Sequence, residues 1–166
     1  MFLIKKNRKI KKYIKITKSN SGVSGPLLCM AHIQLGIELA KNIKINPEDT
    51  TVVAIMRWGM FFSQGIYFEL GCKFCTYNPK TEEYIRPKTK YVILVDSVIN
   101  TGKSVLPLID DNTIIACNVI NEKAVEKFND KLYAIRISSN SFVGQNVKCQ
   151  IGNIGPDTTS RLFNLI

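Results

Sequence analysis

One stretch of this chain combines the residue types that bind a phosphorylated sugar. The apolar run Val92–Val95 ends in Asp96, and after four more residues comes Thr101–Ser104, with the sequence Thr-Gly-Lys-Ser. The glycine of this tetrapeptide lets the backbone approach an anion, successive N–H groups then point at it, and the two hydroxyls add donors. Since a carboxylate repels phosphate, we expect Asp96 to accept hydrogen bonds from sugar hydroxyls instead. The pattern therefore predicts a ligand with a ribose 5-phosphate group.

Two other phosphate-binding motifs do not fit this loop. A Walker A loop requires a glycine where this chain has Ser97, and a dinucleotide-binding fingerprint requires three spaced glycines where this loop has one. The remaining alternative is a strand, a turn and a helix cap without a ligand. That alternative is disfavoured, because Asp, Thr-Gly and Ser fall together directly after an apolar strand.

Strands that alternate with helices are predicted to position these residues. Strands are predicted at residues 51–56, 72–77, 91–96, 113–119 and 131–138. Helices are predicted from Pro26 to about 45, at 61–70, after the Thr-Gly-Lys-Ser loop to about 110, and at 122–129. This order predicts an α/β fold with a doubly wound, mostly parallel sheet and helices on both faces. Asp96 would then lie at the carboxyl end of a strand, where open α/β sheets bind ligands.

The composition favours a single domain in a reducing compartment. A length of 166 residues suits one domain with a sizeable core. The chain has no apolar run long enough to span a membrane and no signal-peptide pattern at its start. Its five cysteines form no disulfide framework, and we interpret the Cys72/Cys75 pair as structural. We therefore expect a cytoplasmic protein with no dedicated metal ligands and no membrane partner.

The excess positive charge lies at the N-terminus. The net charge is +10, and eight basic residues occur within the first 18 positions, before the first acid at Glu38. We divide the chain into a basic N-terminal arm or edge strand, residues 1–23, and a domain at 24–166. Lysines alternating with apolar residues over 10–16 favour an edge strand, since lysine discourages edge-to-edge pairing. The alternative is a tail that contacts a polyanion such as RNA or DNA.

From about Ser24 to Phe163 the chain resembles uracil phosphoribosyltransferase, a branch of the type I phosphoribosyltransferases. Asp96–Ser104 is similar to that family's Asp-Pro-Met-Leu-Ala-Thr-Gly-Gly-Ser, and Ala54–Met60 is similar to its first loop, Ile-Leu-Arg-Ala-Gly-Leu. In the family these loops bind phosphoribosyl pyrophosphate (PRPP). The resemblance implies the following PRPP-binding residues: Arg57, Trp58, Gly59, Asp96, Ser97, Asn100, Thr101, Gly102, Lys103 and Ser104. Of these, Asp96 and Arg57 are implied to be catalytic.

The C-terminal segment carries the resemblance to the uracil branch. Residues 152–163 resemble Pro-Gly-Leu-Gly-Asp-Ala-Gly-Asp-Arg-Leu-Phe, which wraps the base in that family. The implied base-binding residues are Ile154, Gly155, Asp157, Arg161 and Phe163. Pro156 and Ser160 depart from the family pattern, which leaves a non-uracil acceptor as an alternative.

The resemblance implies transfer of ribose 5-phosphate from PRPP to a nucleobase, uracil, with release of pyrophosphate, as in pyrimidine salvage. It also implies Mg²⁺ bound mainly through PRPP, and a homodimer. The family's Tyr-Arg-Asp is missing from the loop at 78–90, where Lys80, Arg86 or Lys88 could supply the cation. We expect His32 to have a packing or capping role. A different class of function stays open, namely a non-catalytic regulator of this fold that binds nucleotide and RNA or DNA.

Overall fold

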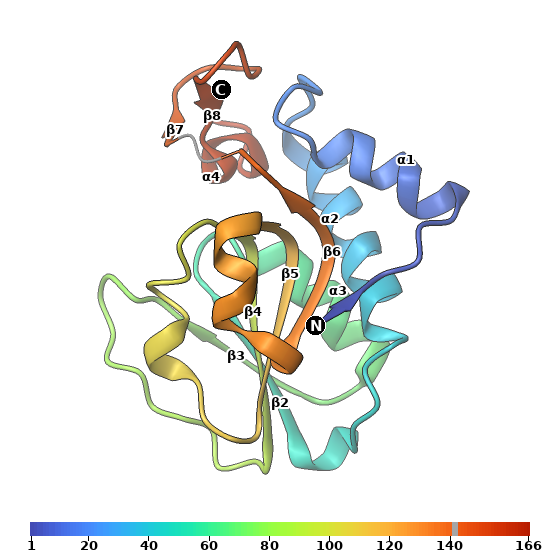
Figure 1. Cartoon of the computed structure of the whole chain (residues 1–166), viewed down its shortest axis with the longest axis vertical. Coiled ribbons are helices and arrows are strands. Elements are labelled where there is room, and N and C mark those ends of the chain that lie inside the picture. Colours follow the sequence, from blue (N-terminus) through green and yellow to red (C-terminus); the bar gives the residue numbers. More distant parts are fainter. Residues whose placement is uncertain (141–142) are drawn as a thin grey trace.

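A six-stranded parallel sheet forms the centre of the molecule in a computed structural model that describes residues 1–140 and 143–166 (Figure 1). The strand order is β1-β6-β5-β4-β2-β3, and each neighbouring pair is parallel. The strands are β1 Phe2–Leu3, β2 Thr50–Ile55, β3 Lys73–Tyr77, β4 Tyr91–Ile99, β5 Thr113–Asn121 and β6 Leu132–Ser138. The apolar runs of the inner strands β2, β4 and β5 are buried on both faces, as is typical of parallel sheets, whereas the edge strands β1 and β3 are partly exposed. The predicted doubly wound α/β class is confirmed.

Long helices cover one face of the sheet and short 3₁₀ helices lie on the other. The long helices are α1 Arg8–Thr17, α2 Gly25–Ala40 and α3 Met60–Leu70. The predicted helices near 105–110 and at 122–129 are instead the 3₁₀ helices Leu106–Leu108 and Glu122–Lys127. Both segments are too short to offset the cost of starting an α-helix, and Pro107 removes a backbone donor from the first. None of the helices among the described residues is long and apolar enough to cross a membrane.

The N-terminal segment differs from its prediction. Residues 10–16, predicted as an edge strand, belong to the helix α1, and only Phe2–Leu3 pairs at the sheet edge with β6. Asn7 caps α1 by accepting a hydrogen bond from the Ile10 N–H at 2.9 Å. Ile10 and Ile14 are four residues apart and face the core together, which is a helical period rather than a strand period. Ile4, Ile10 and Ile14 of the N-terminal segment therefore belong to the core, and the domain boundary at residue 23 stays a prediction.

The C-terminal segment forms a small layer above the carboxyl ends of the strands. It contains β7 Gly144–Gln145, which pairs with β8 Gly155–Pro156, and the short helix α4 Thr158–Leu162. Figure 1 shows this segment beside the connection between α1 and α2. The sheet edge, α1 and the C-terminal segment together enclose the candidate site.

Candidate active site

A cleft of about 1090 Å³ lies at the carboxyl ends of β4, β5 and β6. It is bordered by α1 on one side and by the C-terminal segment above. It brings together eight of the predicted site residues: Trp58, Asp96, Asn100, Thr101, Gly102, Ser104, Asp157 and Arg161. The other predicted residues, Arg57, Gly59, Ser97, Lys103, Ile154, Gly155 and Phe163, do not line it. Asp96 and three residues of the Thr-Gly-Lys-Ser loop therefore line one cavity. Of the five predicted base-binding residues, only Asp157 and Arg161 line it.

Asp96 lies inside a strand rather than at its end, because β4 continues to Ile99. The side chain is only 3% exposed, and its Oδ1 accepts a hydrogen bond from the Val98 N–H at 3.2 Å. Burial raises the pKa of Asp96 to about 7, and hydrogen bonds from the Val98 and Ser97 N–H groups oppose this rise. Burial thus shifts the balance toward the protonated carboxyl group. A ligand that donates hydrogen bonds to it would favour the ionised form.

The Thr-Gly-Lys-Ser loop turns at Gly102, whose φ of 77° is in the left-handed region that favours glycine. The Gly102 carbonyl accepts hydrogen bonds from the Val105 and Leu106 N–H groups at 3.0 and 2.9 Å, which closes the turn. Lys127 of the 3₁₀ helix after β5 donates to the Thr101 carbonyl at 2.9 Å. Lys127 was missed from the sequence, since it is 26 residues away in the chain and its contact is with backbone.

The loop between β2 and α3 holds the residues predicted for pyrophosphate. The Gly59 N–H donates to the Ile55 carbonyl at 2.8 Å, and a Cβ at Gly59 would lie 2.3 Å from the Val95 carbonyl oxygen. A side chain at this position would therefore separate β2 from β4. Arg57 is exposed, and its guanidinium carbon lies 6.0 Å from the centre of the Phe163 ring.

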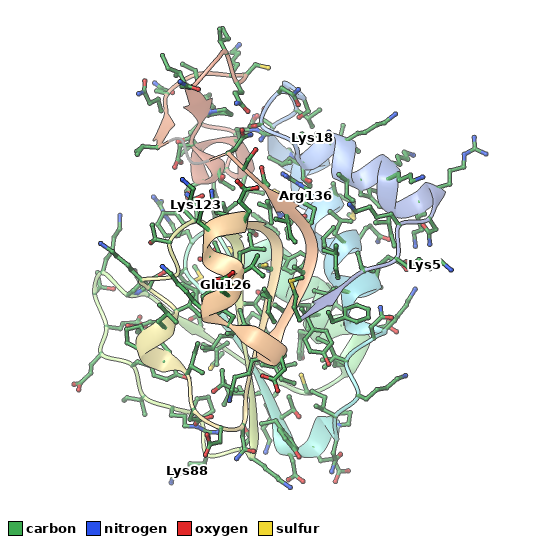
Figure 2. All side chains as sticks on the ribbon, in the orientation of Figure 1. Lys5, Lys18, Lys88, Lys123, Glu126 and Arg136 are labelled. Atoms are coloured by element: carbon green, nitrogen blue, oxygen red, sulfur yellow. The ribbon has the colours of Figure 1, made fainter. Side chains whose placement is uncertain are left out.

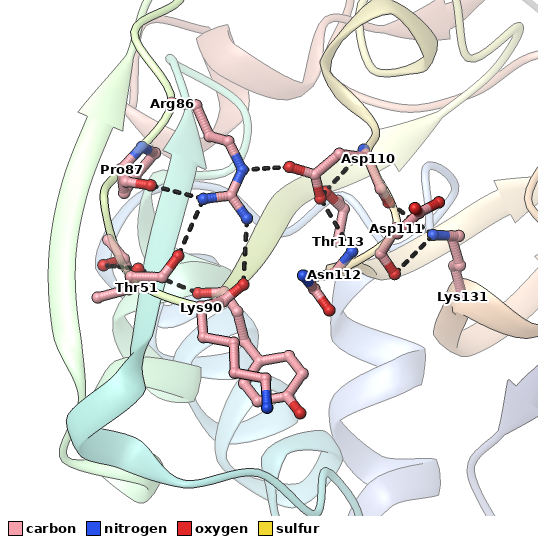
Figure 3. A network of polar contacts seen from close by, with 11 residues as sticks. Thr51, Arg86, Pro87, Lys90, Asp110, Asp111, Asn112, Thr113 and Lys131 are labelled. Carbon is pink, nitrogen blue, oxygen red and sulfur yellow. Dashed lines mark hydrogen bonds and ion pairs between the residues drawn. The ribbon is translucent and has the colours of Figure 1, made fainter.

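The three candidate cations of the 78–90 loop are now distinguished. Arg86 forms an ion pair with Asp110 and donates to the Pro87, Thr89 and Lys90 carbonyls, so its guanidinium is fully engaged (Figure 3). Lys88 lies at the end of the molecule away from the C-terminal segment (Figure 2). Lys80 instead lies near the cleft, with its Nζ 6.0 Å from the centre of the Trp58 ring. Lys80 is therefore the cation placed to approach a ligand.

The predicted base-binding side chains mainly hold the C-terminal segment in place. The Arg161 guanidinium donates to the Val23 carbonyl at 2.8 Å and to the Ser21 Oγ at 3.0 Å. Asp157 caps α4 by accepting from the Ser160 N–H at 2.7 Å. Phe163 packs against Phe61, with ring centres 5.7 Å apart. These side chains therefore hold the C-terminal segment against the rest of the protein, and their contacts with a base stay a prediction.

Several polar residues of the cleft were not predicted as site residues, among them His32, Asn118 and Arg136. His32 of α2 is buried as expected, yet it lines the cleft, and its Nδ1 lies 3.2 Å from the Ser97 Oγ. Burial lowers the pKa of His32 to about 3, so the ring is neutral at physiological pH. Asn118 of β5 and Arg136 of β6 also line the cleft. Their polar side chains inside apolar strands are a signal that could have identified them from the sequence.

Comparisons with known proteins add to this geometry. No family model matches the chain, and no curated protein matches it in sequence. Its structure is similar to the AQ2163 protein from Aquifex aeolicus, with a TM-score of 0.62, 15% identity, and coverage of 85% of this chain and 91% of that one. It is also similar to an APRTase from Giardia lamblia in complex with 9-deazaadenine, with a TM-score of 0.51, 20% identity, and coverage of 68% and 81%.

A hypoxanthine-guanine phosphoribosyltransferase from Bacillus anthracis gives a TM-score of 0.51 at 14% identity, with coverage of 68% of this chain and 81% of that one. This chain has a phosphoribosyltransferase fold. At these identities the likeness establishes the type I phosphoribosyltransferase fold and does not single out the uracil branch. The cleft lies where the carboxyl ends of the parallel strands meet, as expected for a ligand site in an open α/β sheet.

Proposed function

We propose that the protein transfers ribose 5-phosphate from PRPP to a nucleobase and releases pyrophosphate. The observation that carries this proposal is that Asp96 and the Thr-Gly-Lys-Ser loop open into the same cleft. A buried carboxylate and a phosphate-binding turn in one cavity suit the two ends of a ribose 5-phosphate group. The phosphoribosyltransferase fold supports the same conclusion.

The reaction breaks the bond between ribose C1 and the pyrophosphate oxygen and forms a bond from C1 to a ring nitrogen, which loses its proton. The loop at 101–104 would hold the 5-phosphate, and Asp96 would accept hydrogen bonds from the ribose hydroxyls. Arg57 and Lys80 would neutralise the departing pyrophosphate from the β2 side. Positive charge develops on the ribose as the bond breaks, and the ionised Asp96 stabilises it. Positioning and electrostatics of this kind require no covalent nucleophile.

Mg²⁺ is the ion that this proposal implies. The carboxylates that line the cleft are Asp96 and Asp157, and Asp157 already caps α4. No group of three or more metal-binding side chains occurs in the part of the chain that the structure describes. These residues fit an ion held mainly by PRPP oxygens and by water, as Mg²⁺ commonly is, with Asp96 as the nearest protein carboxylate. The ion would neutralise charge on the pyrophosphate.

Uracil is the acceptor that the C-terminal resemblance supports, and a purine is the alternative that the named neighbours suggest. Because Arg161 and Asp157 are engaged within the protein, the C-terminal segment would contact a base mainly through its backbone. The C-terminal side chains therefore do not identify the acceptor base, which a direct assay would identify.

The test is to incubate the protein with PRPP, Mg²⁺ and each of uracil, hypoxanthine and adenine, and to identify the nucleoside 5′-monophosphate by chromatography and mass spectrometry. We expect Asp96→Asn to lower product formation by at least about 100-fold, the loss seen when one electrostatic group at a reacting centre is removed. Asp111→Asn is the matched control, because Asp111 is exposed and does not line the cleft. Full activity of Asp96→Asn would contradict the proposal.

The regulator function is the second candidate, and one observation favours it. Four lysines of the N-terminal segment line the same cleft as Asp96: Lys6, Lys11, Lys15 and Lys18. Lys11 and Lys15 lie four residues apart on one face of α1, and Lys18 follows directly at the end of the helix, so the three lysines form one basic surface beside the cleft. Such a face suits an anion longer than PRPP, including a strand of RNA or DNA.

A further inference from the structure

Two buried polar atoms in the cleft lack a hydrogen-bond partner within residues 1–140 and 143–166. They are the Nε of Arg136 and the Oδ1 of Asn118. Asn118 is only 1% exposed, and both residues line the cleft. Buried polar groups in folded proteins are nearly always hydrogen-bonded, because an unpaired one loses its water without compensation. A ligand that supplies the missing partners would explain both atoms.

The strand order sets these two atoms on the side of Asp96 that lies away from the loop after β2. The strand order β6-β5-β4-β2 sets Asp96 of β4 between the pyrophosphate loop after β2 and Arg136 on β6. Arg136 pairs with Val119, and Asp96 pairs with Cys117, so their Cα atoms are two strands and about two residues apart, roughly 10–12 Å. An incoming base must attack C1 from the side opposite the leaving pyrophosphate. With the pyrophosphate on the β2 side of Asp96, that side would face β5 and β6.

The charge around Arg136 leaves its guanidinium available. The ion pairs among the described residues are Lys9–Glu38, Lys41–Glu38 and Arg86–Asp110, and none involves Arg136. Burial lowers the pKa of Arg136, yet an arginine stays charged at neutral pH. Figure 2 shows this residue on β6, between α1 and the C-terminal segment. A buried cation of this kind requires an oxygen-bearing partner.

We propose that Arg136 and Asn118 form the acceptor subsite and select bases that carry both an exocyclic oxygen and a ring N–H. The reasoning is that a guanidinium only donates hydrogen bonds, whereas the Asn118 Oδ1 only accepts them. Oxopyrimidines and oxopurines present both groups, while adenine has no exocyclic oxygen. This proposal rests on the proposed function and assigns the substrate class of the same site.

The test measures equilibrium binding, so that it does not depend on turnover. The ligands are ribose 5-phosphate and the 5′-monophosphates of uridine, inosine and adenosine, titrated calorimetrically into the full-length protein. We expect uridine or inosine monophosphate to bind at least about 10-fold more tightly than adenosine monophosphate and ribose 5-phosphate, as one charged hydrogen bond in a buried site would give. Equal affinity for the three nucleotides would overturn the acceptor proposal.

Substitutions at Arg136 and Asn118 test whether these residues cause the preference among the nucleotides. Arg136→Met keeps the length of the side chain and removes its donors, and we expect it to abolish the preference while ribose 5-phosphate binding changes by less than about 2-fold. Asn118→Leu should weaken the same nucleotides, and Arg136→Lys should restore part of the preference. Arg8→Met is the matched control, since Arg8 is exposed and does not line the cleft. A preference that survives both Arg136→Met and Asn118→Leu, with thermal melting showing folded variants, would assign base selection to other residues.

The two proposals fail in different ways. Absence of ribose 5-phosphate binding would contradict the proposed function, and the acceptor subsite with it. Binding of ribose 5-phosphate without discrimination among nucleotides would contradict only the acceptor subsite. Loss of ribose 5-phosphate affinity in Arg136→Met would show that this arginine supports the sugar site instead.

Discussion

At the scale of single residues, Asp96 is a buried carboxyl group whose pKa is raised. Its carboxyl group is 3% exposed and its pKa is raised to about 7, so the free protein does not hold a permanent charge there. Ionisation would be completed by a ligand whose hydroxyls donate to the carboxylate. The same burial that makes the charge costly also strengthens its interaction with the positive charge that develops on a ribose.

The raised pKa gives a pH dependence with a definite sign. Below pH 7 Asp96 is protonated and loses acceptor capacity for the ribose hydroxyls, so kcat/KM for PRPP should fall about tenfold per pH unit. Above pH 7 the profile should level off. The assay is steady-state kinetics between pH 5.5 and 8.5, with inorganic pyrophosphate binding as the control, because that anion has no hydroxyls for Asp96. A flat kcat/KM profile across this range would contradict a role for Asp96 in binding the ribose.

The sequence allows a sugar-binding site to be predicted at Asp96 and residues 101–104 because these residues are close together in the chain. Asp96 and the loop at 101–104 form a local pattern whose geometry follows from a strand, a turn and the absence of a Cβ at Gly102. Arg136 and Asn118 were not predicted as site residues, because the sequence does not show that β5 lies beside β4 and β6 beside β5. Arg161 was given a role in base binding, whereas its guanidinium is engaged by Val23 and Ser21, 138 and 140 residues away in the chain. No local pattern reports such contacts.

At the scale of elements, the backbone conformation of the Thr-Gly-Lys-Ser loop depends on Gly102. Its φ is 77°, and a Cβ there would lie 2.6 Å from the Cζ of Phe128. Gly102→Ala should therefore cost about 1–2 kcal/mol of stability and raise the KM for PRPP at least about 10-fold, because the loop must shift. Gly71→Ala is a matched control, with a φ of 64° and nothing within 4 Å of an added Cβ. Gly71→Ala should lose a similar amount of stability, measured by urea unfolding, and keep the KM for PRPP. An unchanged KM for PRPP in Gly102→Ala would exclude this loop from PRPP binding.

Element prediction succeeded where apolar periodicity was long and failed where it was short. The helices α2 and α3 and the inner strands follow from runs bounded by glycine or proline. The segment at 10–16 was assigned to a strand, although Ile10 and Ile14 are also compatible with a helix, and the sequence contains both periods. The helix prevailed through packing of these side chains against the core of α2, which local pattern cannot report.

At the scale of the whole molecule, the positive charge is concentrated beside the cleft. Lys11 and Lys15 of α1 and Lys18 at its C-terminal end border it, while Ile10 and Ile14 of the same helix belong to the core. Deleting residues 1–18 would remove core side chains, so charge removal is the sharper test of a polyanion site. The predicted homodimer stays a prediction.

The regulator function predicts that replacing Lys11, Lys15 and Lys18 together by Gln weakens the binding of single-stranded RNA. The slope of the logarithm of the binding constant against the logarithm of the salt concentration should become shallower by about 2–3. The matched control replaces Lys41, Lys44 and Lys90, which do not line the cleft, by Gln. Fluorescence anisotropy between 50 and 200 mM salt, a range in which phosphate contacts weaken strongly, is the measurement. RNA binding that is absent, or equal in the two variants, would argue against the regulator function.

The central claim is that the cleft transfers ribose 5-phosphate from PRPP, and release of pyrophosphate tests it most directly. With PRPP, Mg²⁺ and an oxopyrimidine or oxopurine base, we predict base-dependent release that falls at least about 100-fold in Asp96→Asn and is unchanged in Asp111→Asn. The claim would be contradicted if no pyrophosphate were released with any of uracil, hypoxanthine and adenine. Equal release from Asp96→Asn and Asp111→Asn would contradict it as well.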